Sequence, residues 1–437
     1  MKYHQHSLKI TTLSPLHIGN DENLTSIGEY VTTKDKINIV DSDSFITLLE
    51  KEKLINSYLD KILNDGNETR IWDFIDENKI TIPYSKSLKF NSPLDFDINS
   101  NNTLELAIET NNQKYVPGSS LKGAIRSLLF LHLITNEKQD LLKKITDSIK
   151  IVFDDRVKTK KTFGYITSKV ASIEETCFNN DFKYIRPEDS KSIVDNNTCI
   201  EVTKRHHLHK EIEGLDLLRE CIAKDVEIKM NLTTLPNLDN KQTTLAFVNQ
   251  KDLKSLFSIL NSITKKIIAY EINLLTKAND AIGNQLIKTL KSYIQQIDNS
   301  KNDYAIVRLG KGKSYFYQTL IPFLDEPNQS KLLKLLHNKV EKINRNEFKI
   351  SLEEYILTYP RTRVLTGNNE MFGWLKIESE SFNEFGESPK KTSQKSKPNK
   401  YQDRSKKQAK TQYNPQRTGN SLGDILKQAL KKGNSKN

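Results

Sequence analysis

Cysteine is scarce in this sequence: Cys177, Cys199 and Cys221 are the three in 437 residues. So few cysteines exclude a disulfide scaffold and suit a reducing compartment. Long apolar runs are missing too, because the longest, around residues 128–134, is broken by His132 and is far too short to span a bilayer. The first residues lack the apolar segment of a signal peptide. We therefore expect a soluble cytoplasmic protein with no membrane contact.

Acidic residues are fewer than basic ones: 55 Asp and Glu stand against 67 Lys and Arg, which gives a net charge of +12. Most of the excess lies in residues 379–437, which hold 14 Lys or Arg and 5 Asp or Glu, a net of +9. Such a charge predicts a polyanionic partner. The chain before this segment carries only the remaining +3, so a nucleic-acid site there has to be a local basic groove.

Hydrophobic periodicity predicts an α+β fold. Alternating apolar residues indicate strands at 6–14, 28–33, 36–41, 103–110, 224–232, 303–310 and 373–378. Helical spacing predicts helices from 41, from 119, over 251–297 with a break near 279–283, and over 329–344. Residues 151–215 are polar and irregular, and we expect long loops there.

The order of these elements predicts two α+β sandwiches in tandem, over 1–235 and over 236–378, the second with a helical insertion. Residues 379–437 are expected to form a disordered basic tail, because 388–418 are rich in Lys, Gln, Ser, Asn and Pro. Within this tail, apolar residues at helical spacing follow a capping-box pattern that starts at Ser421. They predict a short helix over 421–432.

Residues 117–126, PGSSLKGAIR, predict a turn followed by a helix that a serine caps. Lys122 and Arg126 are four residues apart, so they share one face just inside the helix N-terminus. Backbone N–H groups, the helix dipole and two cations together could cradle a phosphate. On the local pattern alone, an ordinary capped amphipathic helix with solvated Lys122 and Arg126 is the simpler interpretation.

Three further segments carry unusual patterns. Residues 13–19, LSPLHIG, indicate a strand end, a turn and a histidine of structural type. Residues 308–314, RLGKGKS, are similar to a nucleotide-binding P-loop, but Val307 stands where that motif needs glycine. A basic, glycine-bearing loop that can approach phosphate remains. Residues 359–363, YPRTR, precede GWLK at 373–376, a pattern that a solvated loop before a strand explains equally well.

Together, in this order and spacing, the four segments resemble the RAMP superfamily of CRISPR-associated proteins. PGSSLKGAIR is typical of RAMP proteins in general. The full order at this length resembles the family of fifth subunits of type III-A (Csm) effector complexes, over about residues 6–378. The chain is too long for the shorter, single-domain backbone subunit that cuts target RNA. The basic extension beyond residue 378 departs from the family pattern.

The resemblance implies two packed ferredoxin-like (RRM-like) domains in a subunit without catalytic activity, metal or cofactor. Such a subunit caps the backbone filament at the 3′ region of the crRNA and is needed for crRNA 3′-end maturation and antiviral defence. The implied partners are crRNA, target RNA nearby, the repeated backbone subunit, the small helical subunit and a host trimming nuclease. The resemblance does not explain the tail. From its residues we expect 421–432 to fold as a helix on a neighbouring subunit or a trimming nuclease, while 390–417 attract RNA diffusely; a solubilising appendage is an equally good interpretation of the tail.

The resemblance also assigns residues. The start of the 117–126 helix would contact crRNA phosphates, the 13–19 loop would adjoin it, and residues 310–313 would form a second phosphate-binding loop. Arginines of the 359–363 and 205–210 segments would add contacts. The implied RNA-binding residues are His17, Gly19, Ser119, Ser120, Lys122, Arg126, Arg205, Gly310, Lys311, Gly312, Lys313, Arg361 and Arg363.

Residues 205–210, RHHLHK, support an alternative function, a metal-independent endoribonuclease that processes precursor crRNA. Histidine is the usual general acid or base in RNA cleavage, and His206, His207 and His209 are the candidates. We favour an RNA-contacting or solvated polar loop, because the sequence identifies no second catalytic partner. A zinc site built from Cys199, Cys221 and these histidines has no CxxC or matching His spacing to support it.

Overall fold

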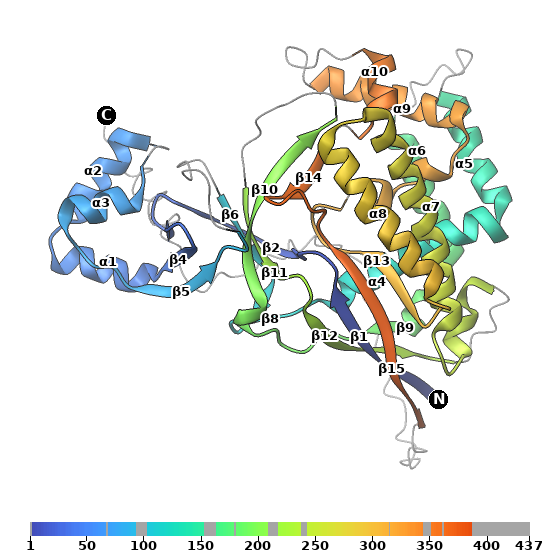
Figure 1. Cartoon of the computed structure of the whole chain (residues 1–437), viewed down its shortest axis with the longest axis horizontal. Helices are drawn as coiled ribbons and strands as arrows, with labels where there is room; N and C mark the ends of the chain where they lie inside the picture. Colours follow the sequence, from blue (N-terminus) through green and yellow to red (C-terminus); the bar gives the residue numbers. More distant parts are fainter. Residues whose placement is uncertain are drawn as a thin grey trace, which may run out of the picture.

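The computed structural model describes residues 2–66, 69–92, 103–152, 163–178, 181–208, 217–236, 243–313, 315–343, 351–360 and 362–386. Two five-stranded sheets form the centre of the molecule, helices cover one side, and a smaller lobe projects on the other (Figure 1). None of the helices in these ranges is long and apolar enough to cross a membrane. The predicted tail over 379–437 lies outside the described residues from 387 onward, as does the helix at 421–432.

The first sheet consists, in spatial order, of β13 (Tyr304–Arg308), β15 (Trp374–Gly386), β1 (Lys2–Thr12), β12 (Glu227–Thr234) and β9 (Ile185–Pro187), all antiparallel. β1 is central because its alternating residues place Leu8 and Ile10 in the core. The predicted end of the last strand at residue 378 is wrong. β15 continues to Gly386 because β1 offers it a backbone partner along the whole length.

The second sheet consists, in spatial order, of β14 (Thr362–Thr366), β10 (Thr198–His207), β11 (Leu217–Ile222), β6 (Thr103–Ala107) and β2 (Gly19–Thr25). Of the strand pairs described in this sheet, only β11–β6 is parallel. Both sheets combine strands from before and after residue 235. The predicted boundary at 235 therefore does not separate the sheets, and the division into two units stays a prediction.

Seven helices among the described residues lie on one side of the sheets. α7 packs on β13 and on α8, and α4 packs on α7 and β9. Asn279 in the left-handed region (φ 51°) ends α7, and the Asp280 side chain caps α8, which confirms the predicted break. The helices are α4 (Gly118–His132), α5 (Gln139–Val152), α6 (Phe163–Phe178), α7 (Lys254–Ala278), α8 (Ala281–Asn299), α9 (Glu326–Ile343) and α10 (Leu352–Thr358).

The expectation of long loops over 151–215 is wrong for much of that range, since α6, β9 and β10 lie within it. The error has a physical cause. β10 buries Thr198, Glu201 and Thr203 beside its apolar residues, and these polar side chains hide the strand pattern in the sequence. Helix α4 runs on into a short π-helical turn (Leu133–Glu137), and short 3-10 turns occupy Asp181–Tyr184, Asp195–Asn197, Thr243–Asn249, Tyr315–Gln318 and Ile321–Phe323.

Residues 26–90, which we call the helical lobe, leave the second sheet between β2 and β6. The lobe contains the strands β3 (Tyr30–Thr32), β4 (Lys36–Val40) and β5 (Tyr84–Lys89) and the helices α1 (Ser42–Lys51), α2 (Ile55–Asp65) and α3 (Ile71–Asn78). The predicted hairpin is confirmed as the antiparallel β3–β4 pair. The lobe has its own hydrophobic core, and the aromatic rings of Phe45, Tyr58 and Phe74 pack together within it.

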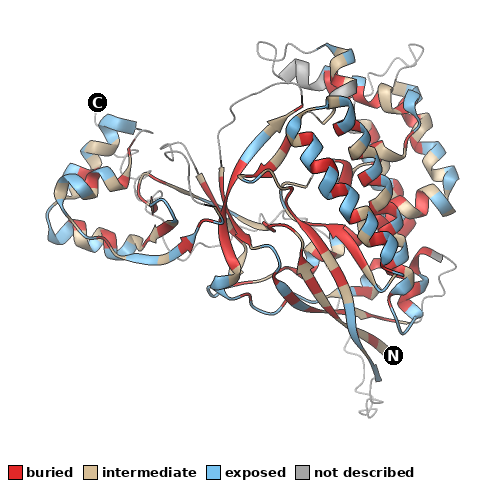
Figure 2. Cartoon of the chain, in the orientation of Figure 1, coloured by how far each residue is buried: buried red, intermediate tan, exposed pale blue. Residues whose placement is uncertain are grey.

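Buried residues follow the contacts between the sheets and the helices, whereas the lobe helices present exposed outer faces (Figure 2). A small hairpin, β7 (Glu109–Thr110) and β8 (Gln113–Lys114), lies where the lobe meets the second sheet. A buried layer with Ile37 and Leu88 of the lobe and Ile200 and Leu218 of the sheet joins the two parts. The lobe is therefore held to the sheet by apolar contact as well as by the chain.

One buried carboxyl group in the second sheet makes stability depend on pH. Burial raises the pKa of Glu201 to about 7, although Asn91 donates a hydrogen bond of 2.6 Å to it. A carboxyl group whose pKa is raised in the folded state stabilises the protein at low pH, and that contribution is lost as pH rises to about 7. We expect a loss of about 1 kcal/mol between pH 6 and pH 8. Urea titrations of wild type and Glu201→Gln at pH 6 and pH 8 measure this loss in the free energy of unfolding. If the variant loses as much stability as the wild type over this range, Glu201 is not its cause.

Candidate nucleic-acid interface

Three of the four unusual sequence segments meet at one place, which we call the loop junction (residues 13–19, 308–313 and 371–374). The Gly373 N–H donates to the Pro15 carbonyl at 2.9 Å, and the Leu309 N–H donates to the Gly373 carbonyl at 2.8 Å. The Lys311 N–H donates to the His17 carbonyl at 2.8 Å. Backbone hydrogen bonds thus bring together the 13–19 and 308–313 loops, which are almost 300 residues apart in the chain.

Two glycines make this junction possible. Gly310 and Gly373 have φ of +82° and +81°, a backbone region that residues other than glycine rarely adopt. A Cβ atom on Gly310 would lie 2.4 Å from the His17 carbonyl oxygen, and one on Gly373 would lie 1.9 Å from the Leu309 carbonyl oxygen. The glycine-bearing loop predicted from RLGKGKS therefore serves first to let backbone approach backbone.

His17 lies inside the junction. Its ring is fully buried, and Nδ1 lies 2.7 Å from the Glu220 carbonyl oxygen, so Nδ1 carries the proton that it donates. Burial lowers the pKa of His17, which keeps the ring neutral. A Cβ atom on Gly19 would lie 3.1 Å from the other ring nitrogen. His17 and Gly19 therefore shape the loop, and RNA contact through the His17 ring is corrected to a structural role.

Lys311 is an exposed cation of the junction. Its ammonium group lies 2.6 Å from Glu105 Oε1, and the buried Arg219 donates its Nε–H to Glu105 Oε2 at 2.5 Å. Burial alone would raise the pKa of Glu105, but the hydrogen bonds from Lys311 and Arg219 lower it. Glu105 is therefore anionic and holds Lys311 while about half of that side chain stays exposed. Burial, and then the charge of Arg308, lowers the pKa of Lys313.

The helix over 118–132 begins as predicted, but without the predicted serine cap. Pro117 takes the N-cap position, and the Asp189 carboxylate accepts the Gly118 N–H at 2.8 Å. A carboxylate thus already occupies part of the helix N-terminus, which corrects the idea of an open phosphate cradle there. Ser119 is exposed and Ser120 is half-buried in the first turn.

Lys122 and Arg126 lie on one face of α4, but their electrostatic surroundings differ. Arg126 forms a 2.6 Å ion pair with Glu174 of α6, and its guanidinium lies over the rings of Phe178 and Phe182. Burial, and then the charges of Arg186 and Arg126, lowers the pKa of Lys122. We call Lys122, Arg126 and Arg186 the α4 basic cluster.

Arg186 was missed in the sequence because β9 was expected to be a loop. The three cations of the α4 basic cluster come from α4 and β9, two elements that are far apart in the chain. Burial is the main cause of the lowered pKa of Lys122, and the charges of Arg186 and Arg126 add to it. Arg126 has the acidic partner Glu174, whereas the charges that act on Lys122 are both positive. A phosphate would relieve that repulsion.

Two arginines of the 359–363 segment were predicted to contact RNA. Arg361 lies outside the described residues. Arg363 is 3% exposed, donates its Nε–H to Glu271 Oε1 at 3.1 Å and donates Nη1–H to the Pro360 carbonyl. Its predicted RNA contact is therefore wrong, because the guanidinium is used inside the protein.

The polar 205–210 segment is the end of β10 rather than a loop, as far as it is described. Arg205 is exposed, whereas His206 Nε2 lies 3.2 Å from Asp280 and His207 Nδ1 lies 3.4 Å from the Thr362 hydroxyl. His209 lies outside the described residues. Arg205 stays a prediction as an RNA contact.

Cys199 and Cys221 lie opposite each other in the β10–β11 pair and are buried beside Phe372. Burial raises the pKa of Cys199 to about 12, so the thiol is protonated. His206 lies farther along the same strand, at a separation from Cys199 that corresponds to roughly 23 Å. The strand geometry therefore separates the ligands of the zinc site considered above.

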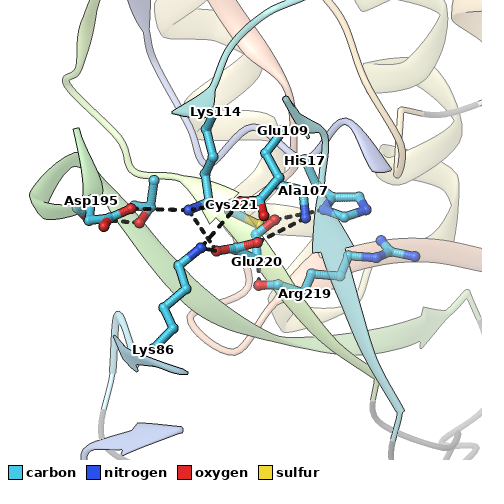
Figure 3. Close-up of polar contacts among 10 residues, drawn as sticks. His17, Lys86, Ala107, Glu109, Lys114, Asp195, Arg219, Glu220 and Cys221 are labelled. Carbon is cyan, nitrogen blue, oxygen red and sulfur yellow. Dashed lines mark hydrogen bonds and ion pairs between the residues drawn. The ribbon is translucent and has the colours of Figure 1, made fainter. Parts of the chain in front are cut away.

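A buried ionic cluster that sequence patterns do not reveal lies next to the junction (Figure 3). Glu220 of β11 is 1% exposed; its Oε1 lies 2.9 Å from Lys114 Nζ and 3.1 Å from Lys86 Nζ, and its Oε2 accepts the Ala107 N–H at 3.0 Å. Lys114 is 2% exposed and also reaches Asp195 at 3.2 Å. Since Lys86 belongs to the lobe, the cluster fixes the lobe to the second sheet.

Comparison with known proteins gives the family. The sequence model of the RAMP superfamily matches residues 9–434. The chain belongs to the RAMP superfamily. It is also 24% identical over 403 residues to the "CRISPR system Cms protein Csm5" of Methanocaldococcus jannaschii, with 85% of this chain and 88% of that protein covered. A protein of the same name from Streptococcus thermophilus is 28% identical over 248 residues, 53% of this chain and 64% of that protein.

Two solved structures are similar to this RAMP protein. A chain in the cryo-EM structure of a Csm–crRNA–target RNA ternary complex of a type III-A CRISPR-Cas system has a TM-score of 0.59 at 17% identity, and the match covers 86% of this chain and all of that chain. The crystal structure of T. onnurineus Csm5 has a TM-score of 0.54 at 15% identity, with 84% and 99% covered. These likenesses confirm the mixed α+β RAMP fold.

Proposed function

We propose that this protein is an RNA-holding subunit of a type III-A CRISPR (Csm) effector complex that binds crRNA and cuts no RNA itself. The relatives named above and the complex in which the similar chain was solved support this proposal. The observation that carries it is the loop junction. Two glycine turns present Lys311, about half exposed, on a backbone that hydrogen bonds and Glu105 hold fixed.

The α4 basic cluster supplies the second half of the proposed RNA path. Contacts with phosphates give RNA affinity without base specificity. We expect the largest contributions from exposed cations, which a phosphate can reach, and from cations near other cations, whose repulsion a phosphate would reduce. By this criterion Lys122 and Lys311 are the principal contacts, and Ser119, Ser120, Gly310, Gly312, Lys313 and Arg205 are secondary ones. Arg126 serves mainly to fix α4 to α6 through Glu174.

Finer features of the proposal come from the family resemblance. The two sheets correspond to two tandem ferredoxin-like units, and the protein caps the backbone filament at the 3′ region of the crRNA. Its other partners are target RNA nearby, the repeated backbone subunit, the small helical subunit and a host nuclease that trims the crRNA 3′ end. Co-purification of a discrete crRNA with other Csm subunits tests this set directly. Recovery of the protein alone, without RNA, would speak against it.

RNA binding is expected to weaken with little dependence on base sequence when Lys122 and Lys311 are replaced by alanine. Each lost phosphate contact should reduce the slope of log affinity against log salt by roughly 0.7 for single-stranded RNA. Fluorescence anisotropy with a labelled crRNA at several salt concentrations measures both quantities.

Lys34→Ala is the control for each single replacement, because it removes one positive charge from an exposed turn of the helical lobe. We expect it to leave the slope unchanged. A Lys122→Ala, Lys311→Ala double variant with wild-type affinity and slope would remove both residues from the proposed path.

Processing of precursor crRNA by the protein itself is the alternative, and the contact between His206 and Asp280 is the observation that favours it. Incubation of the purified protein with precursor RNA in the absence of divalent metal separates the two functions. The RNA-holding proposal expects intact RNA. Specific cleavage that His206→Ala, His207→Ala or His209→Ala abolishes would establish the ribonuclease instead.

A further inference from the structure

The helical lobe has the opposite charge to the rest of the chain. Its helical part, residues 41–79, contains ten Asp or Glu and five Lys or Arg, a net of −5 in a protein of net +12. Acidic side chains are exposed on all three helices, among them Asp43, Glu50, Asp60, Asp73 and Glu77. A surface of this sign repels phosphate, so the lobe is unsuited to holding RNA and suited to a basic protein segment.

The lobe also carries an open apolar groove between α1 and residues 81–83. Leu48, Ile82 and Pro83 form its floor, and Thr47 and Lys51 stand at its rim, around a cavity of about 450 Å³. Ile82 is buried in the lobe core, whereas Thr47 and Lys51 are exposed. Lys51 is the charged residue of the lining, and exposed Asp43 and Glu50 lie elsewhere on the same helix. An apolar groove on a lobe of net negative charge fits an amphipathic helix that carries lysines.

A segment with these properties exists in the chain itself. In residues 421–432, SLGDILKQALKK, apolar residues recur at positions 422, 425, 426, 429 and 430, the spacing of one helix face. Lys427, Lys431 and Lys432 flank that stripe. A helix of about twelve residues is marginal in water by itself, so it needs a surface to form on. The stripe matches the apolar floor of the groove, and the lysines match the net negative charge of residues 41–79.

The connecting chain is long enough to bring the two together. The described part of the chain ends at Gly386 of β15, and the segment 387–420 connects it to Ser421. A connection of this length spans at most about 110–120 Å when extended. A folded body of this size has a radius of gyration of roughly 20 Å. The 421–432 segment can therefore reach α1 from the far end of β15 without strain.

We propose that residues 421–432 dock as a helix in the α1 groove of the helical lobe of the same chain. Electrostatic attraction between the basic tail and the acidic lobe would bring the segment in, and burial of the leucine stripe on Leu48, Ile82 and Pro83 would hold it. While it is docked, the 421–432 segment covers the α1 groove and is not available to RNA. This proposal does not depend on the proposed function, because it concerns two parts of one chain.

Lysine cross-linking of the full-length protein tests the docking, because Lys51 stands at the groove and Lys427 and Lys431 lie in the segment. We expect cross-links from Lys51 to Lys427 or Lys431 in the wild type. Leu426→Asp with Leu430→Asp keeps every lysine but removes the apolar stripe, and the yield should fall by about tenfold or more. Thr47→Arg on the exposed rim should have the same effect from the other side.

Hydrogen exchange of α1 gives a second readout, since docking should slow exchange in Ser42–Lys51 in the wild type and not in either variant. Leu63→Asp is the matched control: Leu63 is exposed on α2, away from the groove, and the cross-links should persist. Equal yields in wild type and both docking variants would overturn the proposal. So would cross-links that, in a mixture of light and heavy isotope-labelled protein, join only different molecules.

Discussion

Replacement of Glu271 by alanine is expected to destabilise the protein by about 3–5 kcal/mol. Glu271 lies on α7 with no exposed surface, and it is the acidic partner of Arg363 at 3.1 Å and of Arg308 at 4.0 Å. The Tyr317 hydroxyl also donates to it, at 3.1 Å. Loss of the carboxylate leaves two buried guanidinium groups without this counter-charge, which costs far more than the pair itself contributes.

The free energy of unfolding from urea titrations measures this effect. Asp298→Ala is the matched control, because Asp298 on α8 pairs with Lys265 of α7 in an exposed ion pair. Exposed pairs contribute about 0–1 kcal/mol, so the control should lose no more than that. Glu271→Met with Arg363→Met should recover part of the loss, since one unpaired charge is gone. A Glu271→Ala variant as stable as the control would show that Arg308 and Arg363 do not need Glu271.

The Glu271 cluster also shows where sequence analysis stops. Arg363 was assigned to RNA because its segment resembles the family pattern, and arginines are mostly exposed. Its burial depends on Glu271, which lies 92 residues away in a helix of the other layer. The pair Glu220 and Lys114 escaped notice for the same reason, since it joins β11 to the distant β8. Buried ion pairs between distant segments leave no periodic pattern.

Elements whose cause is local could be predicted. The strand over 6–14, the β3–β4 hairpin and the break between α7 and α8 follow from alternation, turn residues and a cap. β10 and the extension of β15 could not, because a backbone partner rather than local alternation makes them strands. The glycines of the 310 loop were recognised as flexible. Their function, contact with the 13–19 loop, needed the structure.

The distribution of charge gives the molecule two faces of different chemistry. The α4 basic cluster and Lys311 belong to the sheets and their helices, whereas the acidic helices lie in the lobe. Lys86 and Glu220 join these two parts through an ion pair whose carboxylate is buried. Beside the proposed RNA path, a fixed acidic lobe would direct the phosphate chain away from itself, which would add to specificity for one path.

Replacement of Gly373 by alanine is the second large effect that we expect. The left-handed backbone alone costs a residue with a Cβ atom about 1–2 kcal/mol. The Cβ atom would lie 1.9 Å from the Leu309 carbonyl oxygen, so the backbone has to move and both hydrogen bonds of Gly373, to Pro15 and from Leu309, are strained. Steric strain of this kind adds about 1–3 kcal/mol. Urea titration and RNA binding should both report the change.

Gly123→Ala is the control for this prediction, because Gly123 is exposed in α4 and an added Cβ atom meets no other atom within 4 Å. Alanine is the better helix former by about 0.5–1 kcal/mol, so the same substitution should stabilise the protein there. RNA affinity should fall in Gly373→Ala and stay unchanged in Gly123→Ala, because only the first shifts the 308–313 loop that carries Lys311. Equal stability and RNA affinity in the two variants would show that the loop junction neither holds the fold nor positions Lys311.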